Sequence, residues 1–212
     1  MAGMTSWLLH DDDALVIAAK PAGLLSVPGR GEDKQDCLAA RVQAAFPDAL
    51  IVHRLDMATS GLMVFARGTT AQRQLGDAFA RRAVSKRYIA IVAGRPPNDA
   101  GEIDMPLAPD WPRRPRQQVD MAGGKPSLTR YRLLSHDVAS NTSRLELEPV
   151  TGRSHQLRVH LLAIGHPIVG DALYAPEAVQ ALAPRLLLHA QQLTLPHPAD
   201  GGLVSFEHAA PF

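Results

Sequence analysis

The sequence has few of the residues on which cross-linking and metal binding depend. Its 212 residues include one cysteine, Cys37, which cannot form an internal disulfide, and no CxxC pair that could seat a zinc ion. A single cysteine is typical of a reducing compartment, so we expect a cytoplasmic protein. The nine histidines form no HExxH pair, and His155 and His160 are too far apart in sequence to align on one helix face. The sequence therefore predicts no metal site.

Long apolar runs and phosphate-binding glycine motifs are also absent. No segment reaches the roughly 20 apolar residues that cross a bilayer. Residues 1–16 lack the basic start and the apolar core of a signal peptide. Neither GxxxxGK[ST] nor GxGxxG occurs, so a nucleotide cofactor has no support. We expect a globular protein that binds no membrane and no cofactor.

The charges that are present are unevenly distributed. The formal net charge is +1. Residues 51–135 nevertheless contain 14 Lys and Arg against 7 Asp and Glu, a local charge of +7. A basic middle of this kind suits a polyanion such as nucleic acid, although a solvated charged surface would give the same count.

Short strands outnumber helices in the pattern of apolar residues. Helical spacing predicts helices over 35–46, 69–82 and 154–165, with Thr69 or Thr70 as the N-cap of the second. Strand patterns begin at residue 14 and recur at 51–52, 62–66, 86–94, 127–135, 143–150 and 185–195. Residues 95–126, rich in Pro, Gly and Arg, are expected to form loops, and 127–135 should pair with 143–150. The order predicts an α+β fold with a mixed, largely antiparallel sheet.

The stretch HRLDMATSG places an acidic residue between a strand pattern and a turn. Asp56 is followed by Thr59, Ser60 and Gly61, whose hydroxyl and backbone groups can hold an ionised carboxylate at the rim of a cleft. A buried carboxylate needs a charged or hydrogen-bonding partner. Asp56 is therefore a candidate catalytic residue, and the alternative is that it only caps the turn.

A second polar cluster lies in TGRSHQLRVH, residues 151–160. Arg153, His155, Gln156 and Arg158 surround the expected start of a helix, which suits a phosphate or a carboxylate. The alternative is a surface helix with ordinary charges. Tyr88, at the start of another strand pattern, is either a core residue or an aromatic that stacks on a flipped base.

These motifs together resemble the pseudouridine synthases that carry the signature HRLDxxTSG. The blocks KPAGLLSVPG, SKRY, TGRSHQLRVHLLAIGHPIVGD and RLLLHA match the family's other motifs in order and cover nearly the whole chain. The resemblance implies the fold of that family, with a catalytic cleft across the sheet. It also implies one catalytic domain over residues 1–212 without an N-terminal S4-type RNA-binding module.

The resemblance implies a role for each matching residue. Asp56 is the catalytic nucleophile, and Arg158 pairs with it and keeps it ionised. Tyr88 is the tyrosine that stacks on the target base and takes part in loss of the C5 proton. Arg54 fills the gap left by the flipped base.

The implied reaction breaks the C1′–N1 glycosidic bond of uridine, rotates the uracil and rejoins it through C5. A carboxylate assists by attacking C1′ or by removing a proton as a glycal forms, and attack at C6 is the alternative. DWPRRPRQ, residues 110–117, is similar to a subgroup that modifies one uridine in a 23S rRNA hairpin loop and one in tRNA anticodon loops. We expect Arg113, Arg114 and Arg116 in this stretch to hold RNA phosphates, and we expect a monomer.

Two rival functions remain open at this point. One is a catalytically inactive RNA-binding protein of the same fold, which would have no reason to retain both Asp56 and Tyr88. The other is a metal-dependent hydrolase, which the absence of ligand spacing disfavours.

Overall fold

The structure, a computed structural model, describes residues 7–212, without the side chain of Asp33. The expected lack of a signal peptide concerns residues 1–16, of which 1–6 lie outside the described residues. Two compact units divide the chain: residues 1–86 with 190–211, and residues 87–189 with Phe212. The chain enters the second unit within β5 (Ser85–Ala93) and returns to the first within β11 (Leu188–Pro196).

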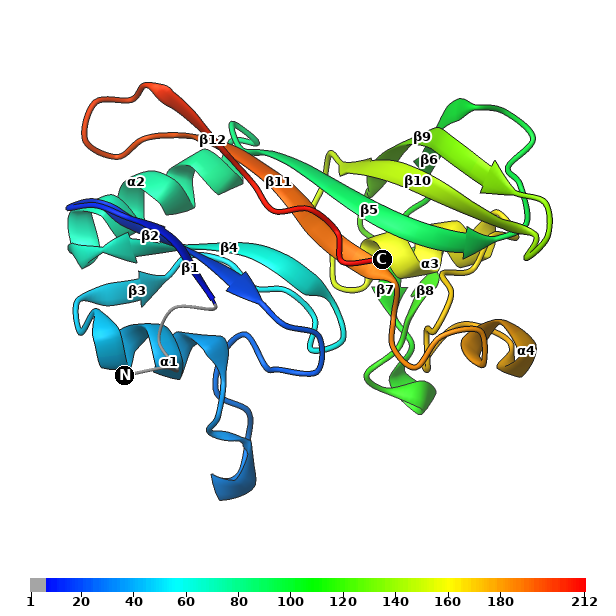
Figure 1. The fold of residues 1–212 in the computed structure, drawn as a ribbon, viewed down its shortest axis with the longest axis horizontal. Coiled ribbons are helices and arrows are strands. Elements are labelled where there is room, and N and C mark those ends of the chain that lie inside the picture. Colours follow the sequence, from blue (N-terminus) through cyan, green and yellow to red (C-terminus); the bar gives the residue numbers. More distant parts are fainter. Residues whose placement is uncertain (1–6) are drawn as a thin grey trace. The chain divides into compact units, whose positions relative to one another are not determined.

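The first unit is an antiparallel sheet with two helices (Figure 1). Its remaining elements are β1 (Leu8–Asp11), β2 (Leu15–Lys20), η1 (Glu32–Lys34), α1 (Leu38–Ala45), β3 (Ala49–Ile51), β4 (Ser60–Arg67), α2 (Gly68–Ala80) and β12 (Leu203–Glu207). β4 pairs with β2 and with β3, β1 pairs with β2, and β12 pairs with β11.

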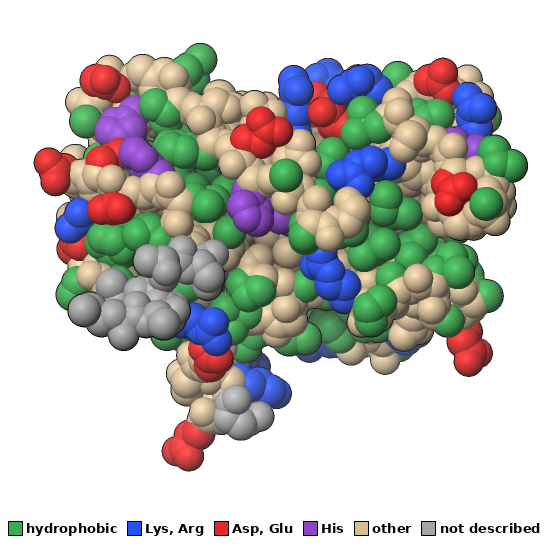
Figure 2. Space-filling model, viewed as in Figure 1, with side chains coloured by type: hydrophobic (Ala, Val, Ile, Leu, Met, Phe, Trp, Pro, Cys, Tyr) green, Lys and Arg blue, Asp and Glu red, His purple; other side chains and the backbone are tan. Residues whose placement is uncertain are grey.

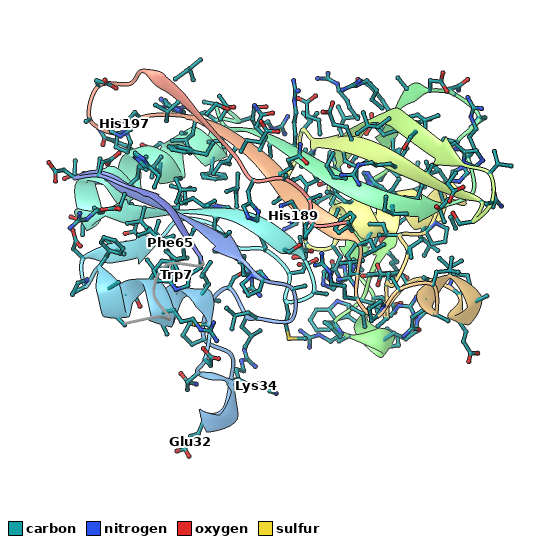
Figure 3. All side chains as sticks on the ribbon, in the orientation of Figure 1. Trp7, Glu32, Lys34, Phe65, His189 and His197 are labelled. Atoms are coloured by element: carbon teal, nitrogen blue, oxygen red, sulfur yellow. The ribbon has the colours of Figure 1, made fainter. Side chains whose placement is uncertain are left out.

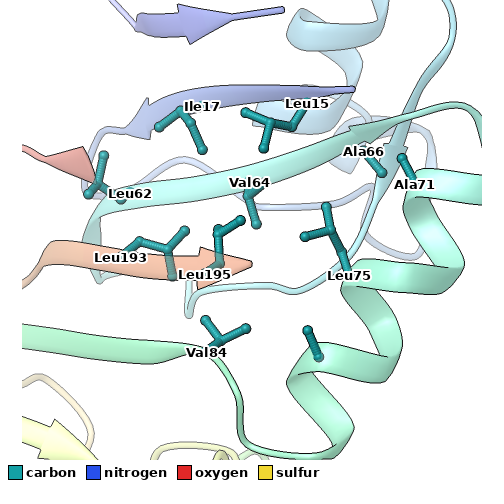
Figure 4. Close-up of a cluster of buried hydrophobic side chains, with 11 residues drawn as sticks. Leu15, Ile17, Leu62, Val64, Ala66, Ala71, Leu75, Val84, Leu193 and Leu195 are labelled. Carbon is teal, nitrogen blue, oxygen red and sulfur yellow. The ribbon is translucent and has the colours of Figure 1, made fainter. Parts of the chain in front are cut away.

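The centres of β2 and β4 are apolar on both faces because helices cover the sheet on both sides (Figure 1). Successive strand residues point to opposite faces, so Leu15 and Ile17 share a face with Leu62 and Val64 across the antiparallel register. Figure 4 shows these side chains packed against Leu75 of α2. A continuous apolar run such as residues 14–19 therefore forms a strand that is buried on both faces.

One half-buried carboxylate joins two turns at the edge of this unit. Asp12 accepts hydrogen bonds from the backbone N–H groups of Ala14 and Leu15 at 2.7 and 2.9 Å. Its Oδ2 lies 2.8 Å from His10 Nε2 and 3.1 Å from His197 Nε2. His197 lies on the loop between β11 and β12 (Figure 3). Partial burial raises the pKa of Asp12, but these hydrogen bonds outweigh it and hold that pKa well below its usual range.

The second unit is a four-stranded antiparallel sheet with a small hairpin beside it. Its elements are β5 from Arg87 onward, β6 (Ala100–Asp104), β7 (Leu107–Pro109), η2 (Trp111–Arg113), β8 (Gln117–Val119), β9 (Leu128–Asp137), β10 (Thr142–Pro149), α3 (Gln156–Ala163) and α4 (Glu177–Gln180). β10 pairs with β5 and β9, and β9 pairs with β6, while β7 and β8 form the hairpin. Alternate residues of β10 are buried, and α3 packs against β8, β9 and β10.

The predicted α+β class with a largely antiparallel sheet is confirmed, as is the pairing of β9 with β10. The expectation that residues 95–126 form only loops was wrong, because β6, β7 and β8 lie there. Each of these strands has at most one buried residue, so no apolar alternation marked them. β1 and β12, which have no buried residues, were missed for the same reason.

Two helix starts differ from the prediction. The N-cap of α2 is Arg67, without a side-chain capping bond, and Thr69 and Thr70 lie inside the helix. The third helix begins at Gln156 rather than Ser154, because His155 is left-handed with φ 54°.

No helix within residues 7–212 combines the length and the hydropathy that a membrane span requires.

The close packing of β4 against the backbone of Ala190 can be tested by a substitution at Gly61 of the TSG triplet. Its φ is +117°, and a Cβ built there would lie 2.3 to 2.7 Å from backbone atoms of Ala190. We predict that Gly61→Ala lowers the free energy of unfolding by about 3 kcal/mol or more, measured by urea denaturation. Gly76→Ala in α2 is the matched control, because its Cβ would meet nothing within 4 Å. It should raise stability by roughly 1 kcal/mol. Equal effects of the two substitutions would contradict the packing described.

Candidate functional site

The Asp56 loop follows β3 and ends where β4 begins. Asp56 is half-buried, between buried Leu55 and exposed Met57. The turn closes with a hydrogen bond from the backbone N–H of Thr59 to the carbonyl of Asp56, at 3.1 Å. The carboxylate therefore stands at the first position of a tight turn that is fixed by its own backbone.

A second segment holds this loop on both sides of Asp56. The Ser26 hydroxyl donates to the carbonyl of Leu55 at 2.7 Å and accepts from the N–H of Leu55 at 3.0 Å. The Lys20 ammonium group donates to the carbonyl of Met57 at 3.0 Å, and the N–H of Gly23 donates to the same carbonyl at 2.9 Å. The residue before Asp56 and the residue after it are thus both anchored to residues 20–26.

Lys20 is an unusual anchor because its side chain is almost completely buried. It is 1% exposed, and it also donates to the carbonyls of Pro21 and Leu24 at 2.9 and 2.8 Å. A buried ammonium group is tolerated only where its N–H donors are satisfied. Two of these hydrogen bonds close the KPAGLL turn, and the third ties that turn to the Asp56 loop, so the buried ammonium group positions the backbone of both segments.

His53, at the start of the HRLD motif, is held as a neutral imidazole. The N–H of Val64 donates to its Nε2 at 3.1 Å, which requires that this nitrogen carry no proton. Its ring stacks on Phe79, with 4.8 Å between the ring centroids. Burial lowers the pKa of His53 to about 4, and the charge of Lys86 contributes. Burial also lowers the pKa of Lys86 itself.

Arg54 lies between His53 and Leu55, and its side chain is exposed. No carboxylate of the described residues lies within ion-pair distance of it. An exposed arginine without such a partner is available to an external anion or base.

In the second unit, Arg158 forms a buried ion pair. Arg158 is 4% exposed and Asp171 is 1% exposed. The guanidinium donates from Nε to Asp171 Oδ2 at 2.8 Å and from Nη2 to Oδ1 at 2.7 Å, a bidentate geometry. The guanidinium has further N–H donors on Nη1. Asp171 also accepts from the N–H groups of Leu173 and Tyr174, so the carboxylate that orients Arg158 is itself fixed.

Tyr174 connects Arg158 to the arginine-rich hairpin. Its ring lies 5.0 Å from the Arg158 guanidinium and 5.2 Å from that of Arg116. Its hydroxyl accepts from the N–H of Gln117 at 2.8 Å and lies 2.7 Å from His155 Nδ1. Two guanidinium groups against one ring form a cation–π arrangement that fixes the hairpin to the region of α3.

The start of α3 is held by Gln156, which is 3% exposed. Its Oε1 accepts from the Thr151 hydroxyl and the Arg153 N–H, and its Nε2 donates to the Leu128 carbonyl and the Thr129 hydroxyl. These bonds give Gln156 a structural role, and its expected contact with RNA stays a prediction. The side chain of Arg153 is exposed, with a long bond to the Pro126 carbonyl.

The three arginines of the hairpin have different surroundings. Arg113 pairs with Asp110, with 2.7 Å between Nε and Oδ2. Arg114 stacks over Trp111, 4.0 Å from the ring centroid. Within the described part of the chain, neither Arg114 nor Arg116 has a carboxylate at ion-pair distance. A pocket of about 250 Å³ is lined by Arg113, Arg116 and Tyr174 among others.

The basic charge of the strands is largely compensated. Figure 2 shows Lys and Arg side chains beside Asp and Glu side chains over β9 and β10. Arg130 pairs with Glu102 and Glu148, and Arg132 pairs with Glu146. A solvated charged surface therefore explains the basic residues of these strands. It does not explain the hairpin, where Arg114 and Arg116 carry charge that no carboxylate of the described residues compensates.

The structure thus groups the predicted residues by unit. Arg54 and Asp56 lie in the first unit, and Tyr88 is half-buried on β5 in the second. His155, Gln156, Arg158 and Arg116 meet around Tyr174 and α3. Within residues 7–212, no three His, Cys, Asp or Glu side chains are grouped as a metal site requires.

Sequence reasoning missed the residues that hold the others in place: Lys20, Ser26, His53, Asp171 and Tyr174. One signal was available for Asp171, because a buried arginine needs a carboxylate and Asp171 is the next one along the chain after Arg158. Nothing in the sequence marked Ser26 or Lys20 as buried.

Comparisons with known proteins agree on one family. Residues 14–163 match the family model described as RNA pseudouridylate synthase. The chain is 50% identical over 208 residues to the dual-specificity RNA pseudouridine synthase RluA of Escherichia coli (strain K12), which covers 97% of this chain and 94% of that protein. The protein of the same name from Yersinia pestis is 49% identical over 205 residues, which covers 97% of this chain and 99% of that protein.

Solved structures give the same result. Human RNA Pseudouridylate Synthase Domain Containing 1 superposes with a TM-score of 0.84 at 27% identity, covering 100% of this chain and 86% of that chain. Human RNA Pseudouridylate Synthase Domain Containing 4 superposes with a TM-score of 0.78 at 27% identity, covering 98% of this chain and 90% of that chain.

The Ser26 anchor gives the first prediction for this site. Ser26→Ala removes both hydrogen bonds to Leu55, so the free energy of unfolding should fall by about 1–3 kcal/mol. Turnover should fall as well, because a small displacement of a catalytic group costs on the order of a hundredfold. Ser143→Ala is the matched control, since Ser143 is also buried and bonds to the Gly94 carbonyl and to His136. It should lower stability without lowering turnover. Equal losses of turnover would contradict a positioning role for Ser26.

The second prediction concerns pH. The unfolded pKa of His53 is near 6.5 and the folded pKa is about 4, so the unfolded chain binds more protons between these values. Stability therefore falls as the pH drops through that window, by about 2 kcal/mol between pH 7 and pH 5 from this group. His53→Gln keeps an acceptor for Val64 and should reduce the loss. Burial also lowers the pKa of His160, so this group should contribute to the loss that remains. Urea unfolding at pH 7 and pH 5 measures this loss of stability. A loss in His53→Gln as large as in wild type would contradict the low pKa of His53.

Proposed function

The chain belongs to the RNA pseudouridylate synthase family, and from this premise we propose that it isomerises uridine in RNA stem-loops, at one uridine of a 23S rRNA hairpin loop and one of tRNA anticodon loops. The enzyme class, an RNA pseudouridine synthase and hence an isomerase, follows from the membership. The dual substrate is proposed by likeness to relatives whose name contains the words dual-specificity.

The observation that carries the proposal is the anchored Asp56 loop. A residue that only capped a turn would not require a buried ammonium group and a buried hydroxyl to fix the residues on either side of it. A catalytic carboxylate does, since its distance from the reacting atom sets the rate. We assign Asp56 the role of nucleophile in cleavage of the C1′–N1 bond, after which uracil rejoins the ribose through C5.

The other catalytic roles follow from the resemblance and fit the chemistry of the residues. Tyr88 stacks on the uracil and takes part in loss of its C5 proton. Arg158 acts with the catalytic aspartate, and the Asp171 pair keeps its guanidinium in one orientation. Arg54 fills the stack that the flipped base leaves, for which its exposed side chain is suited.

The reaction moves one bond within a nucleoside and changes no oxidation state, so it needs no redox cofactor. We extend the proposal to a monomer that acts in the cytoplasm, without metal or organic cofactor. Cys37, the single cysteine, is a buried free thiol.

Asp56→Asn tests the catalytic assignment. The amide keeps the shape of the side chain and loses its charge and nucleophilicity, so tritium release from an anticodon-type stem-loop labelled at C5 of uridine should become undetectable. Binding of that RNA should stay within roughly tenfold of wild type. Asp77→Asn, on the exposed face of α2, is the control and should keep full activity. Turnover by Asp56→Asn near the wild-type rate would exclude the mechanism, and a wild-type protein that binds without turnover would favour the inactive RNA-binding alternative.

The hairpin arginines are proposed to hold RNA phosphates together with Arg153 and His155. Replacing Arg114 or Arg116 by Gln should flatten the dependence of log affinity on log salt by roughly 0.7–0.9 for each phosphate that the protein no longer neutralises. Arg113→Gln should act differently, because it leaves buried Asp110 without its cation, and should lower the stability of the hairpin. The measurement is stem-loop binding from 50 to 200 mM salt, as an approximate range. An unchanged slope in an Arg114→Gln, Arg116→Gln double variant would mean that this hairpin is only a solvated surface.

A further inference from the structure

Trp111, at the tip of the β7–β8 hairpin, has no role in the proposed catalysis. It is the most exposed aromatic residue within residues 7–212. It is 64% exposed, whereas the other tryptophan, Trp7, is 8% exposed. Aromatic residues make up only 5% of the sequence. Single exposed apolar residues need no explanation in general, so only the surroundings of this ring can indicate a ligand.

The hairpin tip around Trp111 is rigid. The N–H of Asp110 donates to the Arg116 carbonyl at 2.9 Å, and the N–H of Arg116 donates to the Arg113 carbonyl at 3.0 Å. Asp110 is 4% exposed and pairs with Arg113. The N–H of Gln117 donates to the Tyr174 hydroxyl, which fixes the base of the hairpin. Figure 1 shows this tip extending away from β9 and β10. A ligand would therefore meet a preformed surface.

The chemistry of the tip is that of a nucleotide site. The Arg114 guanidinium lies 4.0 Å from the Trp111 ring centroid, so it orients the indole by a cation–π contact and places positive charge beside it. Arg116, whose guanidinium lies against the Tyr174 ring, adds a second cation on the same hairpin, and the carboxylate of Asp110 is already engaged by Arg113. An exposed aromatic ring beside one uncompensated arginine, with a second on the same hairpin, matches an unpaired base and its phosphates. A protein partner would instead need a wider apolar patch around the ring.

We propose that Trp111 is a stacking platform for an unpaired base of the RNA loop other than the target uridine, with Arg114 and Arg116 on the adjoining phosphates. The inference rests on the proposed function and adds to it a second base-binding position, separate from Tyr88. The hairpin then binds an unpaired nucleotide of the loop and does not only contact phosphates. The target is then selected partly by the loop that surrounds it.

The chain is suited to a direct test because it has two tryptophans. In a Trp7→Phe, Asp56→Asn protein, Trp111 is the single tryptophan, and its emission can be excited selectively over that of the three tyrosines while the RNA is not turned over. Titration with an anticodon-type stem-loop should quench the indole emission saturably, with the same midpoint as binding followed by anisotropy of labelled RNA. Binding without quenching would overturn the proposal.

Affinity gives the second measurement, in protein that retains Trp7. Trp111→Ala should weaken stem-loop binding about tenfold, the effect of removing one base stack, and Trp111→Phe should stay within about threefold of wild type. Binding to a fully paired duplex of the same length should not change with either substitution. Leu203→Ala is the control, because Leu203 is 75% exposed and lies in the first unit.

Turnover separates this proposal from the proposed function. Trp111→Ala should raise the KM for the stem-loop and leave kcat within about twofold, since stacking away from the target acts on binding. The stacking platform would be overturned if Trp111→Ala bound the stem-loop as tightly as wild type, or if it lost as much affinity for the duplex as for the stem-loop. In either case, tritium release by wild type would still support the proposed enzyme. Absence of tritium release from wild type would instead overturn the proposed function.

Discussion

The hydrogen bonds that residues 20–26 make to both sides of Asp56 are the constraint on which the first unit depends. A buried ammonium group and a buried hydroxyl satisfy backbone groups of Leu55 and Met57, and the register of β2 on β4 places Lys20 opposite Gly61. An error in that register by one residue would move every apolar side chain of β2 to the wrong face. The core between the sheet and α2 and the position of the carboxylate are therefore set by the same strand pairing.

The second unit uses the same principle with different groups. Arg158, Gln156 and His160 are buried polar residues of α3, and each finds partners within its own unit. Buried polar networks specify one arrangement because a displaced donor loses its partner at a cost of about 1–3 kcal/mol. Tyr174 extends this network to the arginine-rich hairpin. The groups proposed to bind RNA are consequently held by the same contacts that orient Arg158.

The long strands and helices could be predicted from the sequence, whereas the residues that hold the candidate site in place could not. Apolar runs such as residues 14–19 and 62–66 revealed β2 and β4, because strands covered on both faces are apolar over most of their length. β12 and the short strands between 95 and 126 escaped prediction because few of their side chains are buried. The left-handed backbone of His155 moved the start of α3, and no local pattern signals that conformation in a histidine.

For the site, the HRLDxxTSG signature predicted a catalytic role for Asp56, but spacing alone left open that it only caps a turn. The hydrogen bonds of Ser26 to Leu55 and of Lys20 to Met57 join residues 29 and 37 positions apart in the chain, and neither segment alone could predict them. The same holds for Tyr174, which meets Gln117 across 57 positions. Contacts of that range are set by the fold, so they become visible only when strand pairing and helix packing are known.

We propose that this chain makes pseudouridine in RNA loops through Asp56. The most direct measurement is mapping of pseudouridine in total RNA from cells that lack this protein, and from the same cells supplied with wild type or with Asp56→Asn. We predict that a small set of uridines, in a 23S rRNA hairpin loop and in tRNA anticodon loops, is unmodified without the protein. Wild type should restore modification at these uridines, and Asp56→Asn should not. Restoration by Asp56→Asn, or an unchanged map in cells that lack the protein, would contradict the claim.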